Sequence, residues 1–202
     1  MKTKQIEIGL HKVTISEGNK KMGSVSSFSV VPFITCAEGV PCMKECYAWR
    51  LCRRYKRVLD SWTENMQTIL QEDPQEIIKH ITEYIHTKQV KLFRWNVGGD
   101  FNLTNYFNIT VEVAKRCPDC KFLAFTKCKK YILREIPDNY SLVFSVWKSY
   151  RVHESRKKYR AAYFNDGNCY IPNHAVKCEG DCENCGKCFN MKKGEAVYFN
   201  KH

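Results

Sequence analysis

The sequence has no long apolar run, no internal repeat and no linker-like segment. Its longest purely apolar stretch is a few residues, far short of the roughly 20 that a membrane-spanning helix requires. The N-terminal segment also has no apolar signal-peptide core and no small-residue cleavage site, so we expect a cytoplasmic protein with no membrane partner. With 10 Gly and 6 Pro among 202 residues, the composition excludes collagenous, disordered and low-complexity classes.

Two quantities depart from this ordinary composition, the cysteine content and the charge. The chain has 12 cysteines, and its 33 Lys and Arg residues exceed its 21 Asp and Glu residues to give a formal charge of +12. A disulfide-rich secreted domain would need an export signal, which the N-terminal segment does not show. Because thiols stay reduced in the cytoplasm, clustered cysteines indicate metal or iron–sulfur ligands.

Strand-like and helix-like segments alternate along the chain, and this alternation is typical of an α/β fold. At this chain length a full eight-stranded barrel is excluded, so we expect a partial (β/α) barrel or an open, mostly parallel sheet. Residues 1–150 should form the core, with residues 151–202 packed on the same domain as a basic, cysteine-rich segment. The predicted strands are 29–35, 90–97, 121–126, 141–147 and 195–199, and the predicted helices are 43–70, 105–116, 129–135 and one opened by Asp73-Pro74 with Ile77, Ile78, Ile81, Tyr84 and Ile85 on one face.

The cysteines of the C-terminal segment give the strongest motif. Three of them follow a C-x2-C-x2-C array, which resembles the run that holds a cubane iron–sulfur cluster more than the separated pairs of zinc sites. The segment is too polar to be a buried core. Iron–sulfur is therefore favoured and zinc is the alternative. The ligands would be Cys182, Cys185, Cys188 and either Cys169 or Cys178, between which the spacing does not choose.

A second set of cysteines follows the first predicted strand. Cys42 and Cys46 are four residues apart and would share a helix face next to Cys36, whereas Cys52 lies about 120° further round. Three thiolates on a cluster leave one iron open, and an open position can bind and activate a small ligand. The alternative is a zinc site completed by a distant residue. No ligand role is assigned to the remaining group, Cys117, Cys120 and Cys128.

Several short motifs follow one another along the chain. They are TC-x5-C-x3-CYA (35–48), FR-x-N-x-GGDF (93–101), F-x-A-FTK (122–127), S-x-W (145–147), the cysteine-rich segment and the closing AVYFNKH. In this order and combination they resemble the phage and prophage gene product eighty-eight family, and the resemblance extends from about residue 24 to the C-terminus. That family looks like a relative of radical S-adenosylmethionine enzymes, which place a three-cysteine loop after the first strand of a partial barrel.

The resemblance implies roles for these positions. Cys36, Cys42 and Cys46 would hold a [4Fe–4S] cluster whose open iron chelates S-adenosylmethionine, and the C-terminal cysteines would hold a second cluster. Reduction by flavodoxin or ferredoxin would cleave the cofactor to a radical. The turn of Gly98, Gly99 and Asp100 would meet the cofactor's amino group.

The substrate is not specified by any residue, and only its surroundings can be predicted. In α/β folds, ligands lie at the carboxyl ends of the strands, so Arg94, Asn96, Lys127 and Lys148 are candidates to line a substrate mouth. Basic residues mixed with aromatics at 44–57 and 148–160 favour a nucleic acid or phosphorylated substrate as partner. The alternative functions are a zinc-stabilised nucleic-acid-binding protein and an iron–sulfur electron carrier.

Overall fold

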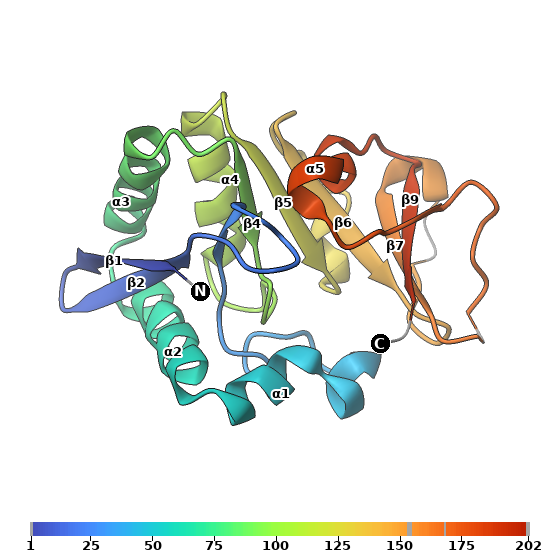
Figure 1. Cartoon of the computed structure of the whole chain (residues 1–202), viewed down its shortest axis with the longest axis horizontal. Helices are drawn as coiled ribbons and strands as arrows, with labels where there is room; N and C mark the ends of the chain where they lie inside the picture. Colours follow the sequence, from blue (N-terminus) through green and yellow to red (C-terminus); the bar gives the residue numbers. More distant parts are fainter. Residues whose placement is uncertain (1, 153–154, 168, 201–202) are drawn as a thin grey trace.

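The computed structural model describes residues 2–152, 155–167 and 169–200, and its centre is one open nine-stranded sheet (Figure 1). The strand order is β1-β2-β3-β4-β5-β6-β7-β9-β8, and β1 and β8 lie at opposite edges, so the sheet does not close into a barrel. All pairings from β3 to β8 are parallel, which confirms the predicted mostly parallel α/β sheet. The strands are β1 (Thr3–Ile8), β2 (His11–Ser16), β3 (Ser26–Phe28), β4 (Leu92–Trp95), β5 (Lys121–Thr126), β6 (Tyr140–Val146), β7 (Arg160–Asn165), β8 (Val176–Lys177) and β9 (Ala196–Asn200).

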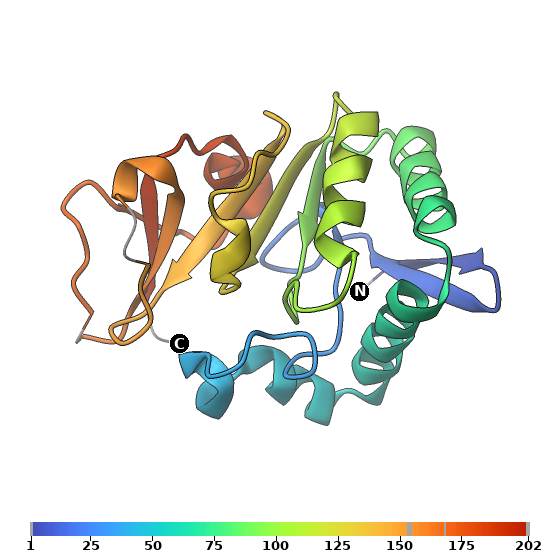
Figure 2. The same cartoon turned by 180° about the vertical axis from the view of Figure 1, so that it is seen from behind.

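Helices cover one face of this sheet and the C-terminal segment covers part of the other. Figure 2 shows α4 in front of the strands, whereas Figure 1 shows α5 in front of them. The helices are α1 (Tyr47–Arg54), α2 (Lys56–Gln71), α3 (Pro74–Thr87), α4 (Tyr106–Arg116) and α5 (Cys182–Cys185), with the 3-10 turns η1 (Pro41–Glu45), η2 (Lys129–Tyr131), η3 (Arg156–Lys158) and η4 (Lys187–Asn190). None of the helices in these described ranges is long and apolar enough to cross a membrane.

Alternation along the strands divides the core into two faces. Phe93 and Trp95 of β4 lie with Phe122 of β5 against α2, α3 and α4, and the Trp95 and Phe122 rings stack with centroids 6.4 Å apart. On the opposite face, Leu123 and Val143 pack against Phe189 and Met191 of the C-terminal segment.

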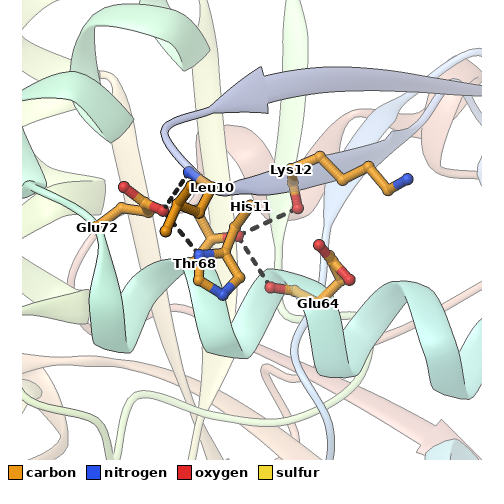
Figure 3. Close-up of polar contacts among 6 residues, drawn as sticks. All are labelled: Leu10, His11, Lys12, Glu64, Thr68 and Glu72. Atoms are coloured by element: carbon orange, nitrogen blue, oxygen red, sulfur yellow. Dashed lines mark hydrogen bonds and ion pairs between the residues drawn. The ribbon is translucent and has the colours of Figure 1, made fainter.

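An N-terminal hairpin that is not among the predicted elements adds two antiparallel strands. β1 and β2 pair along their whole length and are tied to α2 (Figure 3). Glu72 accepts hydrogen bonds from the Leu10 amide at 2.9 Å and pairs with His11 Nδ1 at 2.7 Å, and the Thr68 hydroxyl donates to the Lys12 carbonyl. The hairpin therefore rests on a helix although it lies at the sheet edge.

Three predicted elements differ from the structure. The strand predicted at 29–35 is displaced to β3, because Pro32 has no amide hydrogen to donate and Phe33 takes a left-handed backbone with φ 71°. The single helix predicted at 43–70 is broken at Tyr55, whose backbone is extended. The helix predicted at 129–135 is only the 3-10 turn η2.

The C-terminal segment also contains more regular structure than predicted. β7, with the sequence RAAYFN, and β9 extend the same parallel sheet beyond β6. β7 has no Val, Ile or Thr, so it gives a weak strand signal. The final strand at 195–199 and the helix opened by Asp73-Pro74 are confirmed as β9 and α3.

Candidate metal and cofactor sites

The carboxyl ends of the parallel strands meet at one edge of the sheet, where buried Asp100 connects them. Asp100 Oδ1 accepts from the Thr126 hydroxyl at 2.6 Å and the Phe101 amide at 2.8 Å, and Oδ2 accepts from the Lys127 amide at 2.7 Å. The Asp100 amide in turn donates to the Thr35 hydroxyl, directly before the first cysteine. The loops after β3, β4 and β5 are thus held together through one side chain.

The turn before Asp100 is shaped by packing. A Cβ on Gly98 would lie 2.1 Å from the Trp62 ring. A Cβ on Gly99 would lie 2.6 Å from the Val30 carbonyl oxygen, and Gly99 has a positive φ of 77°. Both glycines are therefore required by close packing in the fold, and Asp100 is required by the hydrogen bonds that it accepts. Their predicted contact with a cofactor stays a prediction.

Burial also affects the Asp100 carboxyl. Desolvation raises its pKa above the ordinary value, and the hydrogen bonds from Thr126 and Lys127 act in the opposite direction. Three donors already bind the two oxygens of Asp100, so the role of this side chain is to hold the ends of the strands together.

The loop with Cys36, Cys42 and Cys46 lies at this same edge, and we call these three cysteines the edge site. Figures 1 and 2 show α1 and the turn before it beyond the carboxyl ends of β4 to β6. The Tyr47 hydroxyl donates to the Val97 carbonyl and fixes the loop to the end of β4. All three thiols are partly exposed.

Within the edge site, Cys42 affects the pKa of Cys36, and Cys46 affects the pKa of Cys42. Burial is the main cause that raises the pKa of Cys36 to about 12, and Asp100 and Cys42 raise it further. Burial also raises the pKa of Cys42, Cys46 adds to this effect, and the Lys127 ammonium, which is hydrogen-bonded to Cys42, opposes it. Lys127 thus supplies a positive charge to the edge site.

The local conformation at the edge site differs from the prediction. Cys42 lies in the 3-10 turn η1 and Cys46 is the N-cap of α1, where its sulfur accepts from the Trp49 amide at 3.4 Å, so the two do not share an α-helix face. Cys52 is buried on α1, and Cys46 contributes to raising its pKa after the effect of burial.

The second group of thiols surrounds a pocket formed by the C-terminal segment. Cys178, Cys182, Cys185 and Cys188 all line this pocket, and we call them the tail site. Cys169 is not among the lining residues and is buried with Phe144 and Val146. The structure thus brings together Cys178, and not Cys169, with the C-x2-C-x2-C array.

Local structure around the tail site follows from its sequence. Asp181 caps α5 by accepting from the Asn184 amide, and Gly186 ends the helix with a left-handed φ of 57°. The Cys178 amide donates to the Tyr198 carbonyl of β9. The Cys182 amide donates to the Lys21 carbonyl, so the tail site also touches the loop before β3.

Burial and neighbouring charges affect the ionisation of Cys182 and Cys188 in this pocket. Burial raises the pKa of Cys188 to about 12, and neighbouring Cys178 and Cys182 raise it further. Burial likewise raises the pKa of Cys182. Arg94 acts in the opposite direction on both thiols.

In neither site are the thiols positioned to coordinate a metal ion as they stand in the described residues. Within the described residues, no three His, Cys, Asp or Glu side chains are close enough together to hold a metal ion as they stand. The tail site nevertheless offers four soft thiol donors around one space, which is the donor set of structural zinc and of iron–sulfur clusters. Its donor chemistry fits such a centre.

The family model described as "Gene product 88" matches residues 4–191. The chain belongs to the gene product 88 family. The edge site and the tail site both lie within the matched region of this family chain. No curated protein and no solved structure matches the chain.

Two of the four residues predicted to line a substrate mouth are partly or fully buried in this gene product 88 chain. Arg94 faces the C-terminal segment, because strand alternation places it opposite Phe93 and Trp95. Asn96 is buried, and its Oδ1 accepts from the Tyr106 hydroxyl at 2.7 Å. The alternation of side chains in the strand sequence VKLFRWNV is the signal that would have placed Arg94 on this face of the sheet.

The other two predicted mouth residues are accessible. Lys127 lies at the edge site, with its ammonium 6.0 Å from the centroid of the Trp147 ring. Lys148 is exposed. Burial is the main cause that raises the pKa of Cys169, and the charge of Lys148 acts in the opposite direction.

Proposed function

We propose that this protein is an iron–sulfur protein with a cluster at the tail site and a second, three-cysteine cluster at the edge site. The observation that carries the proposal is the lining of one pocket by four of the five C-terminal cysteines. Four thiolates match the coordination of a cubane cluster, and C-x2-C-x2-C spacing is typical of one. Cys169, buried in a separate apolar cluster, is left out of the ligand set.

The edge site is the proposed reaction site. Cys36, Cys42 and Cys46 would hold the cluster there, and three protein ligands leave one iron position for a substrate or cofactor. Such a cluster, when bound, supplies the electron that cleaves S-adenosylmethionine. Lys127 balances negative charge beside Cys42. Because the Asp100 oxygens are occupied, we assign any contact of the 98–100 turn with the cofactor to its backbone.

The cluster proposal is tested by anaerobic reconstitution with iron and sulfide, followed by iron and sulfide counts and electron paramagnetic resonance. We expect about four irons per cluster, a sulfide-dependent absorbance and loss of one set of signals in Cys185→Ser. Cys169→Ser is the matched control and should keep all signals. Tightly bound zinc without a sulfide-dependent chromophore would overturn the proposal.

The reaction is tested separately with S-adenosylmethionine and a reductant such as flavodoxin, ferredoxin or dithionite. We expect 5′-deoxyadenosine from the wild-type protein and none from Cys42→Ser, which loses one ligand of the edge site. A clustered protein that forms no 5′-deoxyadenosine would instead be an electron carrier, and the S-adenosylmethionine part of the proposal would fail.

A second candidate function is zinc-stabilised binding of a nucleic acid, favoured by the surface of α1. Arg50, Arg53 and Arg54 are exposed on this helix, and among the described residues none of them pairs with a carboxylate. Exposed Tyr47 and Tyr55 lie beside them, and the Arg54 guanidinium is 5.4 Å from the Tyr55 ring centroid. Cations mixed with exposed rings suit phosphate neutralisation and base stacking.

In the second basic stretch, one of the six basic residues is turned toward the fold. Arg160 is partly buried and donates to the Met191 carbonyl at 2.5 Å, so it serves the fold. Filter binding of a single-stranded oligonucleotide tests the α1 surface: affinity should fall steeply with salt, and more gently in Arg53→Gln. Binding that is indifferent to salt would exclude this function.

A further inference from the structure

Arg94 is a partly buried cation with an unusual set of neighbours. Its guanidinium carbon is 5.1 Å from the centroid of the Phe125 ring, and its Nη1 lies 3.6 Å from the sulfur of Met22. Its buried Nε has no hydrogen-bond partner among the residues that the structure describes. Within the described ranges no carboxylate lies within ion-pair distance of Arg94.

A guanidinium cannot resolve this situation by losing its proton, because arginine stays charged in proteins. The guanidinium of Arg94 is only partly withdrawn from water, and its buried Nε is the atom without an acceptor in the described part of the chain. A nearby source of negative charge would stabilise this cation. A ring face and a thioether supply only a weak one.

The tail site supplies groups of the required kind. Phe125, which carries the guanidinium on its ring, packs in the same cluster as Cys182 and Cys188. Met22, whose sulfur lies 3.6 Å from Nη1 of Arg94, belongs to this same cluster. Four thiolates around a zinc ion or a cubane cluster carry a net negative charge of about −2, and one-electron reduction of a cluster adds another.

We propose that Arg94 is the charge-compensating residue of a metal–thiolate centre at the tail site. This inference rests on the proposed presence of a metal centre there. Arg94 is a positioning residue and not a ligand. Its positive charge, held on β4 against the C-terminal segment, stabilises the negatively charged centre. Its guanidinium favours the more negative reduced state of a cluster, so it raises the reduction potential.

The test is a redox titration of the reconstituted full-length protein, followed by electron paramagnetic resonance. The titration is repeated with Cys42→Ser present, which removes a ligand of the edge site and simplifies the signal. We expect Arg94→Gln and Arg94→Met to lower the equilibrium constant for reduction about tenfold, equivalent to about 59 mV for one electron. Arg94→Lys, which keeps the charge, should restore most of the shift.

Arg116→Gln is the matched control, because Arg116 is an exposed cation on α4 paired with Glu112. It should leave the potential unchanged. Arg94→Met also removes the unpartnered Nε, so it keeps the test valid if the Gln variant folds poorly. If the reduction potential of the cluster in Arg94→Gln and in Arg94→Met equals that of the wild-type protein, the inference is overturned and the proposed function still stands.

The remaining outcomes separate the two proposals. If the wild-type protein binds zinc and no cluster, the iron–sulfur proposal fails, and zinc competition with a chromophoric chelator then tests Arg94. About tenfold weaker zinc binding in Arg94→Met would support its role, and unchanged affinity would overturn it. A wild-type protein that binds neither metal overturns both.

Discussion

Replacement of Asp100 by Asn tests whether one carboxylate joins the strand ends. Asn keeps one oxygen for the Phe101 and Thr126 donors, but its amide nitrogen would face the Lys127 amide, which now lies 2.7 Å from Oδ2. A buried donor left without an acceptor costs about 1–3 kcal/mol. Ala would leave three donors unsatisfied and should cost roughly 3–5 kcal/mol of the free energy of unfolding.

The effect of Asp100→Asn should also depend on pH. Because burial raises the folded-state pKa of Asp100, the folded protein holds this proton more tightly than the unfolded chain does. The stability contributed by Asp100 is therefore complete below the unfolded pKa of about 3.9 and is lost as pH rises through the folded pKa. The stability gap between wild type and Asn should accordingly be larger at about pH 4 than at about pH 8.

Urea denaturation followed by far-UV circular dichroism measures both effects. Asp60→Asn is the matched control, because Asp60 is exposed on α2 and should change stability by less than about 0.5 kcal/mol. A loss below about 0.5 kcal/mol in both Asp100 variants would refute the reasoning. A gap that widens with rising pH would refute the pKa argument alone.

Three further predictions concern the fold around the sites. Gly99→Ala should lower the free energy of unfolding by about 2–4 kcal/mol, whereas Gly39→Ala, with the same kind of positive φ but open space, should cost about 1–2 kcal/mol; equal losses would contradict the contact argument. Asn139→Ala removes an amide within 3.0 Å of three backbone carbonyls and should cost about 2–4 kcal/mol in chemical denaturation, and a neutral variant would show that water replaces it. Glu72→Gln should lower the thermal midpoint at neutral pH, because the hydrogen bond with His11 is the main cause that lowers the pKa of Glu72. This contribution is lost as pH falls through the lowered pKa of Glu72, so the difference in thermal midpoint should shrink in acid, and a difference independent of pH would contradict the reasoning.

Local signals predicted the elements that local chemistry specifies. Asp73 caps α3, Pro74 occupies its first turn, and the predicted apolar face is buried. The apolar runs that form β5 and β6 were equally clear. β7 is not predicted because Ala161 and Ala162 have low intrinsic strand propensity. They adopt the strand conformation because β6 and β9 pair with them on either side.

The candidate sites show a similar division. Spacing alone predicted that Cys182, Cys185 and Cys188 would gather. It left the choice between Cys178 and Cys169 open, because that choice depends on the bond from the Cys178 amide to β9, a contact between distant segments. The face on which Arg94 lies depends on the alternation of side chains along β4, which places it opposite Phe93 and Trp95.

The cover that Phe189 and Met191 place over Leu123 and Val143 has a consequence for synthesis of the chain. On the ribosome, β4, β5 and β6 emerge long before residues 187–191, so this face of the nascent sheet stays open to water until residues 187–191 have been made. Parallel strands also pair slowly, which lengthens the interval. Chains that stop before residue 187 would leave the ribosome with an apolar strip uncovered, and they are the species from which chaperones and proteases must protect the cell.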